Sequence, residues 1–398
     1  MTQSSRKPAN QRVLISGAGV AGPALAFWLA RAGFQPTIVE RAPALRAGGQ
    51  AVDFRGPIHR DVLERMDIWH EIHRHRTRPT DLVLLDRHGQ PHARMPEVMM
   101  SGDVEILRGD LCRILYDRTR GDTDYRFGDH IRSLDEHGDG VTASFASGRT
   151  EDFDLVIGAD GLHSGVRALA FGDERAHLRH QGYRLASFAL QNPLPDHLGA
   201  ACFSDPGRGA CLYGFSQHEA RALLVYAAGP LARGERDPES QRRALADRFA
   251  GMGWVVPQML AALDGANDLY VDAIATVHID RYARGRIGLL GDAAWGGTLG
   301  GQGTSLAIVG AYVLAHELAA ETNPARAWAR YEQAMRPYAS RCQRGATHVG
   351  GFFAPRSRLR LALRNLMYGL LTSRPLSGFF TRLVKDAASD FALPEYAG

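Results

Sequence analysis

Residue types and patterns that would mark several classes of protein are scarce in this chain. Only four of its 398 residues are cysteines, and they form neither a C-x-x-C pair nor the spacing of a metal site: Cys112, Cys202, Cys211 and Cys342. We therefore expect ordinary reduced thiols, a cytoplasmic location and no bound metal. No G-x-S-x-G segment occurs, so hydrolase chemistry at a nucleophile elbow has no support.

Lysine is almost absent, because nearly all of the 47 basic residues are arginines and the two lysines are Lys7 and Lys385. The arginines are scattered among aspartates and glutamates, and the formal net charge is only +4, so we expect no nucleic-acid partner. No uninterrupted apolar run reaches the roughly 18 residues of a transmembrane helix, so we expect no transmembrane segment. The apolar N-terminal segment fits a strand, turn and helix better than a signal peptide.

The chain does contain a regular succession of strands and helices. Apolar periodicity predicts a strand–helix–strand unit over residues 12–40, mainly strands over 125–158 and 182–230, and helices after residue 304. Further helices are expected over 58–75 and 109–119, two more between 238 and 264, and a strand pair over 269–279 and 285–290. Segments that carry chemical motifs lie on both sides of a β-rich stretch, which predicts a domain inserted into another.

The expected fold class is therefore α/β. We predict a Rossmann-like nucleotide-binding domain made of residues 1–171 and 276–345, and a β-sheet substrate domain, 172–275, inserted into it. Residues 346–398 are expected to form C-terminal helices.

A glycine-rich turn, GAGVAG, follows the first predicted strand and opens the first helix. In such a turn Gly17 allows the tight bend, Gly19 lets the backbone approach a diphosphate, and Gly22 lets the helix pack closely on the strand. Val20 and Ala21 begin the helix, whose N-terminus would face the negative diphosphate. The segment therefore predicts a dinucleotide site.

The next predicted strand ends at Glu40, followed by Arg41. A carboxylate at this place can accept hydrogen bonds from both hydroxyls of an adenosine ribose. A second match to the glycine pattern, Gly138 to Ala143, lies inside a predicted hairpin with no helix after it, so we do not assign it to a cofactor. These residues alone leave NAD and FAD equally possible.

Two further motifs distinguish the cofactors. DLVIGADGLHSGVR contains Asp160, and GLLGDAAWGGTLGGQGTS contains Gly291 and Asp292. Together with the glycine-rich turn, they resemble the group A flavoprotein monooxygenases, the single-component aromatic hydroxylases, and most of all the branch of the tetracycline-degrading monooxygenase. The resemblance covers most of the chain, and the motifs occur in the family's order.

The resemblance implies that FAD is the bound cofactor. It implies that Asp160 lies near the FAD diphosphate and the nicotinamide cofactor, and that Gly291 and Asp292 hold the ribityl and diphosphate region. A helix beginning near Gly303 would direct its N-terminus at the pyrimidine edge of the flavin, where negative charge develops on reduction. The backbone of the intervening glycines would lie against the flavin: Gly296, Gly297, Gly300 and Gly301.

Three other residues are assigned through the resemblance. Arg108, just before a predicted helix, would reach the FAD diphosphate or ribityl chain. Arg46 would lie near the nicotinamide cofactor and Asp53 near the flavin. The chain departs from the commoner family pattern in having Trp295 and Leu299 in the loop that faces the flavin, which affects the expected shape of the cavity.

The implied activity is hydroxylation of an aromatic or polyketide-like small molecule. NADPH, or NADH, would bind transiently and reduce FAD, and the reduced flavin would activate O2. Tyr213 and Phe215 are candidates for the substrate pocket, and no residue is assigned as catalytic. Two alternatives stay open: a flavin-dependent dehydrogenase or reductase of the same fold, and a non-catalytic flavin-binding subunit. The protein is expected to be a monomer or a homodimer.

Overall fold

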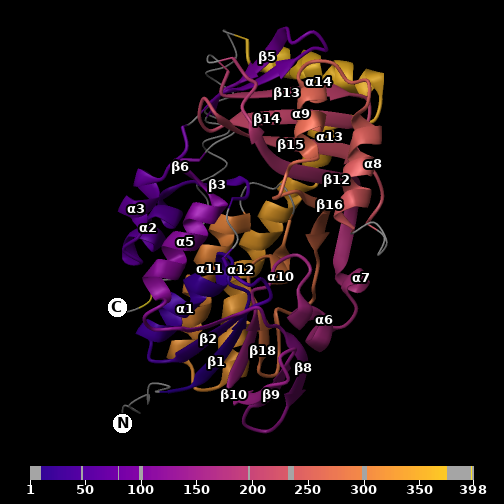
Figure 1. Cartoon of the computed structure of the whole chain (residues 1–398). Coiled ribbons are helices and arrows are strands. Elements are labelled where there is room, and N and C mark those ends of the chain that lie inside the picture. Colours follow the sequence, from indigo (N-terminus) through magenta and orange to yellow (C-terminus); the bar gives the residue numbers. More distant parts are fainter. Residues whose placement is uncertain are drawn as a thin grey trace.

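The computed structural model describes residues 10–45, 48–78, 80–97, 102–195, 198–231, 237–297, 303–373 and 396. Two large β-sheets organise these residues, one in the lower and one in the upper half of Figure 1, with α10 and α11 between them. The lower sheet has six strands and the upper sheet has seven. The predicted α/β class is confirmed.

The six-stranded sheet is parallel except for one edge strand. Its order is β17 (Ala283–Arg284), β18 (Ile287–Leu289), β11 (Leu155–Gly158), β1 (Arg12–Ser16), β2 (Gln35–Glu40) and β7 (Asp124–Phe127). β1 and β11 are almost wholly buried, as expected of parallel strands covered on both faces. The predicted strand–helix–strand unit is confirmed as β1, α1 (Ala21–Arg31) and β2.

Helices and a small antiparallel sheet enclose this sheet. The main helices that share its hydrophobic core are α1, α5 (Arg108–Thr119), α11 (Gly303–Ala320) and α12 (Pro324–Ala346). The strands predicted over 125–158 are confirmed, and three of them form this small sheet: β8 (Ile131–Glu136), β9 (Val141–Phe145) and β10 (Thr150–Phe153). α11 is apolar and long enough to cross a membrane, but 72% of it is buried in the protein, so it serves here as a core helix.

The seven-stranded sheet collects strands from distant parts of the chain. Its order is β16 (Tyr270–Val277), β12 (Leu178–Gln191), β15 (Glu219–Ala227), β14 (Arg208–Gly214), β13 (Ala200–Asp205), β4 (Leu82–Leu85) and β5 (Pro91–Met95). One face packs against α8 (Pro238–Phe249) and α9 (Val256–Leu263). Part of the other face packs against α13 (Val349–Phe353) and α14 (Arg358–Leu371).

This topology bears on two details of the sequence interpretation. β16 and β18, expected as a strand pair, belong to different sheets, so that expectation was wrong. The division of the chain into domains stays a proposal, and the membership of β4 and β5 in the upper sheet supports adding residues 82–95 to the β-rich unit.

Shorter elements connect the two sheets. The helical segment predicted over 58–75 is interrupted, because Asp67 adopts a left-handed conformation with φ 58°. The elements here are α2 (Pro57–Arg65), α3 (Trp69–Arg74), the paired strands β3 (Ala51–Phe54) and β6 (Val104–Leu107), α6 (Gly165–Phe171), α7 (Glu174–His177) and α10 (Asp292–Trp295).

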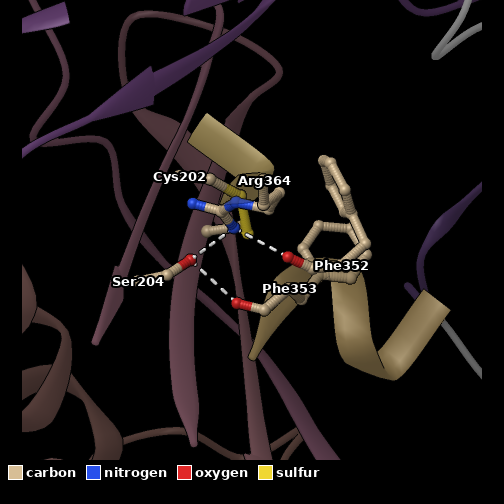
Figure 2. Close-up of a disulfide and its surroundings, with 6 residues drawn as sticks. Cys202, Ser204, Phe352, Phe353 and Arg364 are labelled. Atoms are coloured by element: carbon tan, nitrogen blue, oxygen red, sulfur yellow. Dashed lines mark hydrogen bonds between the residues drawn. A yellow bond between two sulfur atoms is a disulfide. The ribbon is translucent and has the colours of Figure 1, made fainter. Parts of the chain in front are cut away.

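A disulfide joins Cys202 to Cys211 within the upper sheet (Figure 2). The two residues face each other on β13 and β14, because the turn at Pro206 and Gly207 reverses the chain between them. The expectation of four reduced thiols was therefore wrong for this pair. Sequence spacing alone does not reveal this pairing, because the two cysteines are nine positions apart and only the strand register brings them together.

Beside the disulfide, Arg364 anchors α14 to the sheet (Figure 2). Its guanidinium donates to the Ser204 hydroxyl at 2.9 Å and to the Phe352 carbonyl at 2.7 Å. Burial lowers the pKa of Arg364 to about 10. The side chain therefore fixes the C-terminal helices on the sheet through hydrogen bonds in a buried setting.

We expect non-reduced, denatured protein to accept two alkyl labels, on Cys112 and Cys342, and reduced protein to accept four. Because the disulfide closes a short loop, the variant with both Cys202→Ala and Cys211→Ala should lose roughly 2–3 kcal/mol of unfolding free energy. Peptide mass mapping and chemical denaturation measure the two effects, with Cys342→Ala as the control. Four labels without reduction would show that the pair is not bonded.

Candidate functional site

Four parallel strands end at one edge of the lower sheet and bring the predicted motifs together. β1 pairs with β2 and with β11, and β11 pairs with β18, all in parallel. Their carboxyl ends lead into Gly17, Glu40, Asp160 and Gly291 respectively. Hydrogen bonds between the loops fix this edge, including one from the Gly17 amide to the Val39 carbonyl at 2.8 Å. The carboxyl edge of such a sheet is where nucleotides bind.

The glycine-rich turn requires its glycines for reasons of geometry. Gly17 has φ 108°, and a Cβ there would come within 2.6 Å of the Ala159 carbonyl oxygen. A Cβ on Gly22 would overlap the Gly17 carbonyl oxygen. A Cβ on Gly19, by contrast, would have as its nearest neighbour the Arg108 guanidinium, at 3.5 Å. The turn is therefore tight against the sheet and open toward an arginine, and α1 starts after it with Val20 as N-cap and Ala21 as first residue.

Glu40 faces the same turn. Its carboxylate accepts hydrogen bonds from the Ala18 amide at 2.9 Å and the Ala42 amide at 2.8 Å. Each carboxylate oxygen keeps further acceptor capacity, which is what a ribose diol requires. The neighbouring Arg41 is exposed. Glu40 thus occupies the position predicted for a ribose-binding carboxylate, and two backbone amides fix its orientation.

Arg108 is the first residue of α5, and its guanidinium lies beside the glycine-rich turn at Gly19. β3 pairs with β6 so that Ala51 is opposite Leu107, which brings the segment before β3 alongside Arg108. Asp53, in β3, is buried and forms an ion pair with Arg55 at 2.5 Å. Burial raises the pKa of Asp53, and Arg55 opposes this rise.

Asp292 has the environment of a group inside a hollow. Much of its surface is accessible, yet burial raises the pKa of its carboxyl, with Arg108 opposing that rise. Both observations hold if the carboxylate lines a cavity enclosed by protein. It also lies beside the start of α11, since a Cβ on Gly303 would be 3.3 Å from Asp292 Oδ1. The preceding Gly291 has φ 64° and fits between Ala21 and Ala307.

The carboxylate of Asp160 is used within the protein. It accepts hydrogen bonds from the Gly165 amide at 2.9 Å, the Val166 amide at 3.2 Å and the Ser16 hydroxyl at 3.2 Å, and another from the Ser164 hydroxyl. These bonds cap α6 and hold the loop after β11. We therefore expect the backbone of the loop after β11, which Asp160 holds in place, to contact the cofactor, and not the Asp160 carboxylate itself.

Arg167 is a residue whose role the sequence interpretation missed. It is 0% exposed, and its guanidinium donates to the Ala293 carbonyl at 2.9 Å and the Leu162 carbonyl at 2.6 Å. These carbonyls belong to the loop after β11 and to α10. Arg167 thus connects two of the cofactor motifs. It is the last residue of the segment DLVIGADGLHSGVR, but nothing in that segment indicated that its side chain would be completely buried.

The ring of Trp295 points into the core and not toward the cavity edge. It is 2% exposed and packs against Tyr282 at 5.1 Å and Tyr331 at 6.0 Å between ring centroids. The next residue, Gly296, accepts a hydrogen bond from the Val277 amide at 2.8 Å, and Gly297 bridges to Thr276. Three of the remaining predicted site residues, and Leu299, lie outside the described residues: Arg46, Gly300 and Gly301.

One face of the upper sheet lies near the carboxyl edge of the lower sheet. Tyr213 is opposite Arg221 in the β14–β15 pair, and Arg221 forms an ion pair with Asp268 at 2.5 Å. A Cβ on Gly48, which precedes β3, would be 3.2 Å from the Arg221 guanidinium. Phe215 lies just beyond β14, in the turn to β15. Tyr213 therefore lies in the part of the sheet where Arg221 approaches the segment before β3. Phe215 lies beyond the end of β14.

A separate cavity of about 1020 Å³ lies away from these motifs. Residues of α6, β17 and α12 line it, among them Phe171, Arg284 and Trp328. None of the predicted cofactor residues belongs to its lining. The chemistry of the motifs therefore points to the carboxyl edge of the sheet and not to this cavity.

FAD fits the residues at the carboxyl edge. The open side of the glycine-rich turn and the N-terminus of α1 suit a diphosphate, and Arg108 supplies a cation beside it. Glu40 suits the ribose at one end, and the enclosed carboxylate of Asp292 suits ribityl hydroxyls at the other. FMN has no adenosine ribose, so it would leave the remaining acceptor capacity of Glu40 unused.

Comparisons with known proteins agree with this assignment. Residues 10–346 match the protein family described as FAD binding domain. A flavin-dependent monooxygenase of Legionella longbeachae is 34% identical over 394 residues, which cover 97% of this chain and 98% of the relative. Crystal structures of two tetracycline destructases are also similar. Tet(55) has a TM-score of 0.81 and 35% identity, Tet(51) has 0.80 and 33%, and both matches cover 98% of this chain and 100% of the other.

Proposed function

Because the chain belongs to the FAD-dependent monooxygenases, we propose that it uses NADPH and O2 to hydroxylate an aromatic or polyketide-like small molecule. The observation that carries the proposal is the enclosed carboxylate of Asp292 at the start of α11, opposite the glycine-rich turn and Arg108. Bound FAD supplies the hydride acceptor and the oxygen-activating group. The chain supplies binding, orientation and exclusion of water.

Each end of FAD has proposed contacts in the chain. The glycine-rich turn and the N-terminus of α1 bind the diphosphate, Arg108 neutralises part of its charge, and Glu40 accepts the ribose hydroxyls. Asp292 accepts the ribityl hydroxyls. The N-terminus of α11 favours negative charge on the flavin by about 0.3–2 kcal/mol. These roles belong to binding and electrostatics, so no residue is assigned as catalytic.

The proposed substrate lies between the flavin and the face of the upper sheet that carries Tyr213 and Arg221. An aromatic ring beside a cation favours a flat molecule with an acidic hydroxyl, such as a phenol or an enol. Asp268 offsets part of the charge of Arg221. The names of the two similar destructases, at 33% and 35% identity, support a polycyclic polyketide. Phe215 is proposed at the rim of the same pocket.

The proposed reductant is NADPH bound transiently on the FAD domain near Arg46. The second glycine pattern belongs to the β8–β9 hairpin, where the His137 amide donates to the Gly140 carbonyl at 3.0 Å, so the sequence offers NADPH no separate dinucleotide fold. A cationic Arg46 would pair with the 2′-phosphate. The protein is further proposed to act in the cytoplasm, as a monomer or homodimer.

Arg46→Ala should raise the KM for NADPH by about tenfold, because a charge-assisted phosphate contact is lost. The KM for NADH should change little, so the preference between the two cofactors should narrow. Steady-state kinetics with both cofactors measure the effect, and Arg243→Ala, an exposed arginine of α8, is the matched control. Equal losses with NADPH and NADH would remove Arg46 from the phosphate site.

The activity itself is tested by a screen of phenolic and polycyclic compounds for accelerated NADPH oxidation, followed by mass analysis of the products. The proposal expects a product heavier by one oxygen atom. A dehydrogenated product would support the reductase or dehydrogenase alternative. Substrate-dependent turnover by the purified protein alone would exclude a non-catalytic subunit.

A further inference from the structure

Four polar side chains form a continuous hydrogen-bonded string between the two halves of the molecule. The Tyr270 hydroxyl donates to Asp272 Oδ2 at 2.7 Å. His163 Nε2 lies 3.0 Å from Asp272 Oδ1, and His163 Nδ1 lies 2.9 Å from Glu174 Oε2. Tyr270 and Asp272 belong to β16 of the upper sheet, whereas His163 belongs to the loop after β11 of the lower sheet. The string therefore ties the loop after β11 to the upper sheet.

The central pair of this string is ionic. Because both ring nitrogens of His163 face carboxylates, both must donate, which requires the imidazolium form. Hydrogen bonds to Asp272 and then to Glu174 raise the pKa of His163 to about 9. Burial alone would raise the pKa of Asp272, which is 4% exposed, but the bonds from His163 hold it below its usual value. An ion pair in this setting fixes the spacing between β16 and the loop.

The outer end of the string lies near Arg108 and Asp292. Tyr270 is 46% exposed, yet burial raises the pKa of its hydroxyl above the usual range, and both Arg108 and Asp292 act on it electrostatically. Accessible surface combined with strong desolvation is the same pattern that Asp292 shows. The hydroxyl is therefore buried against Asp272, while part of the ring stays accessible on the side where Arg108 and Asp292 lie.

The sheet register places this ring beside the proposed substrate wall. Tyr270 is opposite Ser187 in the β12–β16 pair. Ser187 lies two residues from Ala189, on the same face of β12, and Ala189 is opposite Arg221. Arg221 is in turn opposite Tyr213. Four neighbouring strands thus present Tyr270, Ser187, Arg221 and Tyr213 on one face.

We propose that the ring of Tyr270 contacts bound FAD, and that Asp272 and His163 are positioning residues that hold this ring and the loop after β11 at a fixed distance. This inference rests on FAD occupying the carboxyl edge of the lower sheet. It assigns a role to a tyrosine at the start of β16, outside the three cofactor motifs. The hydroxyl is committed to Asp272, so the ring and not the hydroxyl makes the contact.

The test is FAD titration of the apo-protein and of single variants. Tyr270→Ala should weaken FAD binding about fivefold, because it removes the ring. Tyr270→Phe keeps the ring but loses its hydrogen bond to Asp272, so it should weaken binding by no more than about threefold. Asp272→Asn and His163→Gln should each weaken binding about threefold through a displaced ring. His137→Gln is the matched control, since His137 also contacts an aspartate, Asp139, but in the exposed β8–β9 hairpin.

A double-mutant cycle separates positioning from separate structural effects. If Asp272 and His163 act through one bond, the variant carrying both Asp272→Asn and His163→Gln should lose no more FAD affinity than the weaker-binding single variant. Bound-flavin fluorescence provides a second readout, because a tyrosine in contact with a flavin quenches it by electron transfer and a phenylalanine does not. Tyr270→Phe should therefore be brighter than wild type when loaded.

The pH dependence of apo-protein stability reports the ionic state of the string. The groups around His163 are Asp272, Glu174, His180 and Arg167, whose guanidinium lies 3.7 Å from Glu174. A raised folded-state pKa stabilises the fold fully below the unfolded value of 6.5, and this contribution is lost as pH rises through about 9. The difference in Tm between wild type and His163→Gln should therefore be largest below pH 6.5 and vanish by about pH 10.

Unchanged FAD affinity and fluorescence in Tyr270→Ala, with wild type binding FAD normally, would overturn this inference and leave the proposed function intact. Additive losses in the double variant, or a Tm difference independent of pH, would overturn the positioning role. A wild-type protein that binds no FAD would instead overturn the function on which the inference rests.

Discussion

Replacement of Asp292 by alanine is expected to weaken FAD binding by roughly ten- to a hundredfold, because charge-assisted hydrogen bonds to flavin hydroxyls contribute about 1.5–3 kcal/mol. The same change should not destabilise the apo-protein. Burial raises the pKa of Asp292 and, among the described residues, Arg108 opposes that rise, so the carboxylate carries a desolvation cost in the apo-protein. Removing the carboxylate should leave the apo-protein Tm unchanged or higher.

Flavin titration and thermal unfolding of the apo-protein measure the two effects of Asp292→Ala separately. Asp139→Ala is the control, because Asp139 is an almost fully exposed aspartate of the β8–β9 hairpin. Wild-type FAD affinity in Asp292→Ala would exclude the ribityl contact. A strong loss of apo-protein stability would show that Asp292 is a structural residue and that its environment is not a cofactor cavity.

Replacement of Arg167 by methionine should have the largest effect on stability. The change keeps most of the side-chain volume but leaves the carbonyls of Ala293 and Leu162 without their donor. Each hydrogen bond from a charged group contributes about 1.5–3 kcal/mol, so the unfolding free energy should fall by about 3 kcal/mol or more. FAD affinity should also fall, since Arg167 holds two cofactor loops together.

Urea unfolding of the apo-protein, with flavin titration alongside, measures both losses in Arg167→Met. Arg60→Ala is the matched control, because the exposed pair of Arg60 with Glu64 is expected to contribute less than about 1 kcal/mol. A variant with wild-type stability would mean that the buried guanidinium is not needed to join the loops.

The parts of the site that the sequence predicted depend on local pattern. Gly17 lies between β1 and α1, Gly22 lies in the first turn of α1, and Glu40 ends β2. The parallel pairing of β1 with β2 then brings them to one edge of the sheet. The start of α11 near Gly303 was also predictable, because an apolar helix follows a run of glycines. In each case the type of residue and its place next to a strand or helix were enough to predict its position.

The parts that the sequence did not predict depend on tertiary contacts. His163 and Asp272 are 109 residues apart and meet only because the upper sheet lies against the loop after β11. β4 and β5 join that sheet through a parallel pairing with β13, which no local pattern reports. The same holds for the Cys202–Cys211 disulfide, which depends on strand register, and for the complete burial of Arg167.

The central claim is that this chain binds FAD and transfers oxygen from O2 to a small molecule. The most direct test uses the purified protein with FAD, NADPH and a substrate from the phenolic and polycyclic screen, under ¹⁸O2. The product should contain one ¹⁸O atom, and its formation should require NADPH. A product without ¹⁸O, formed with the same consumption of NADPH, would contradict the claim and assign the chain to flavin chemistry without oxygen transfer.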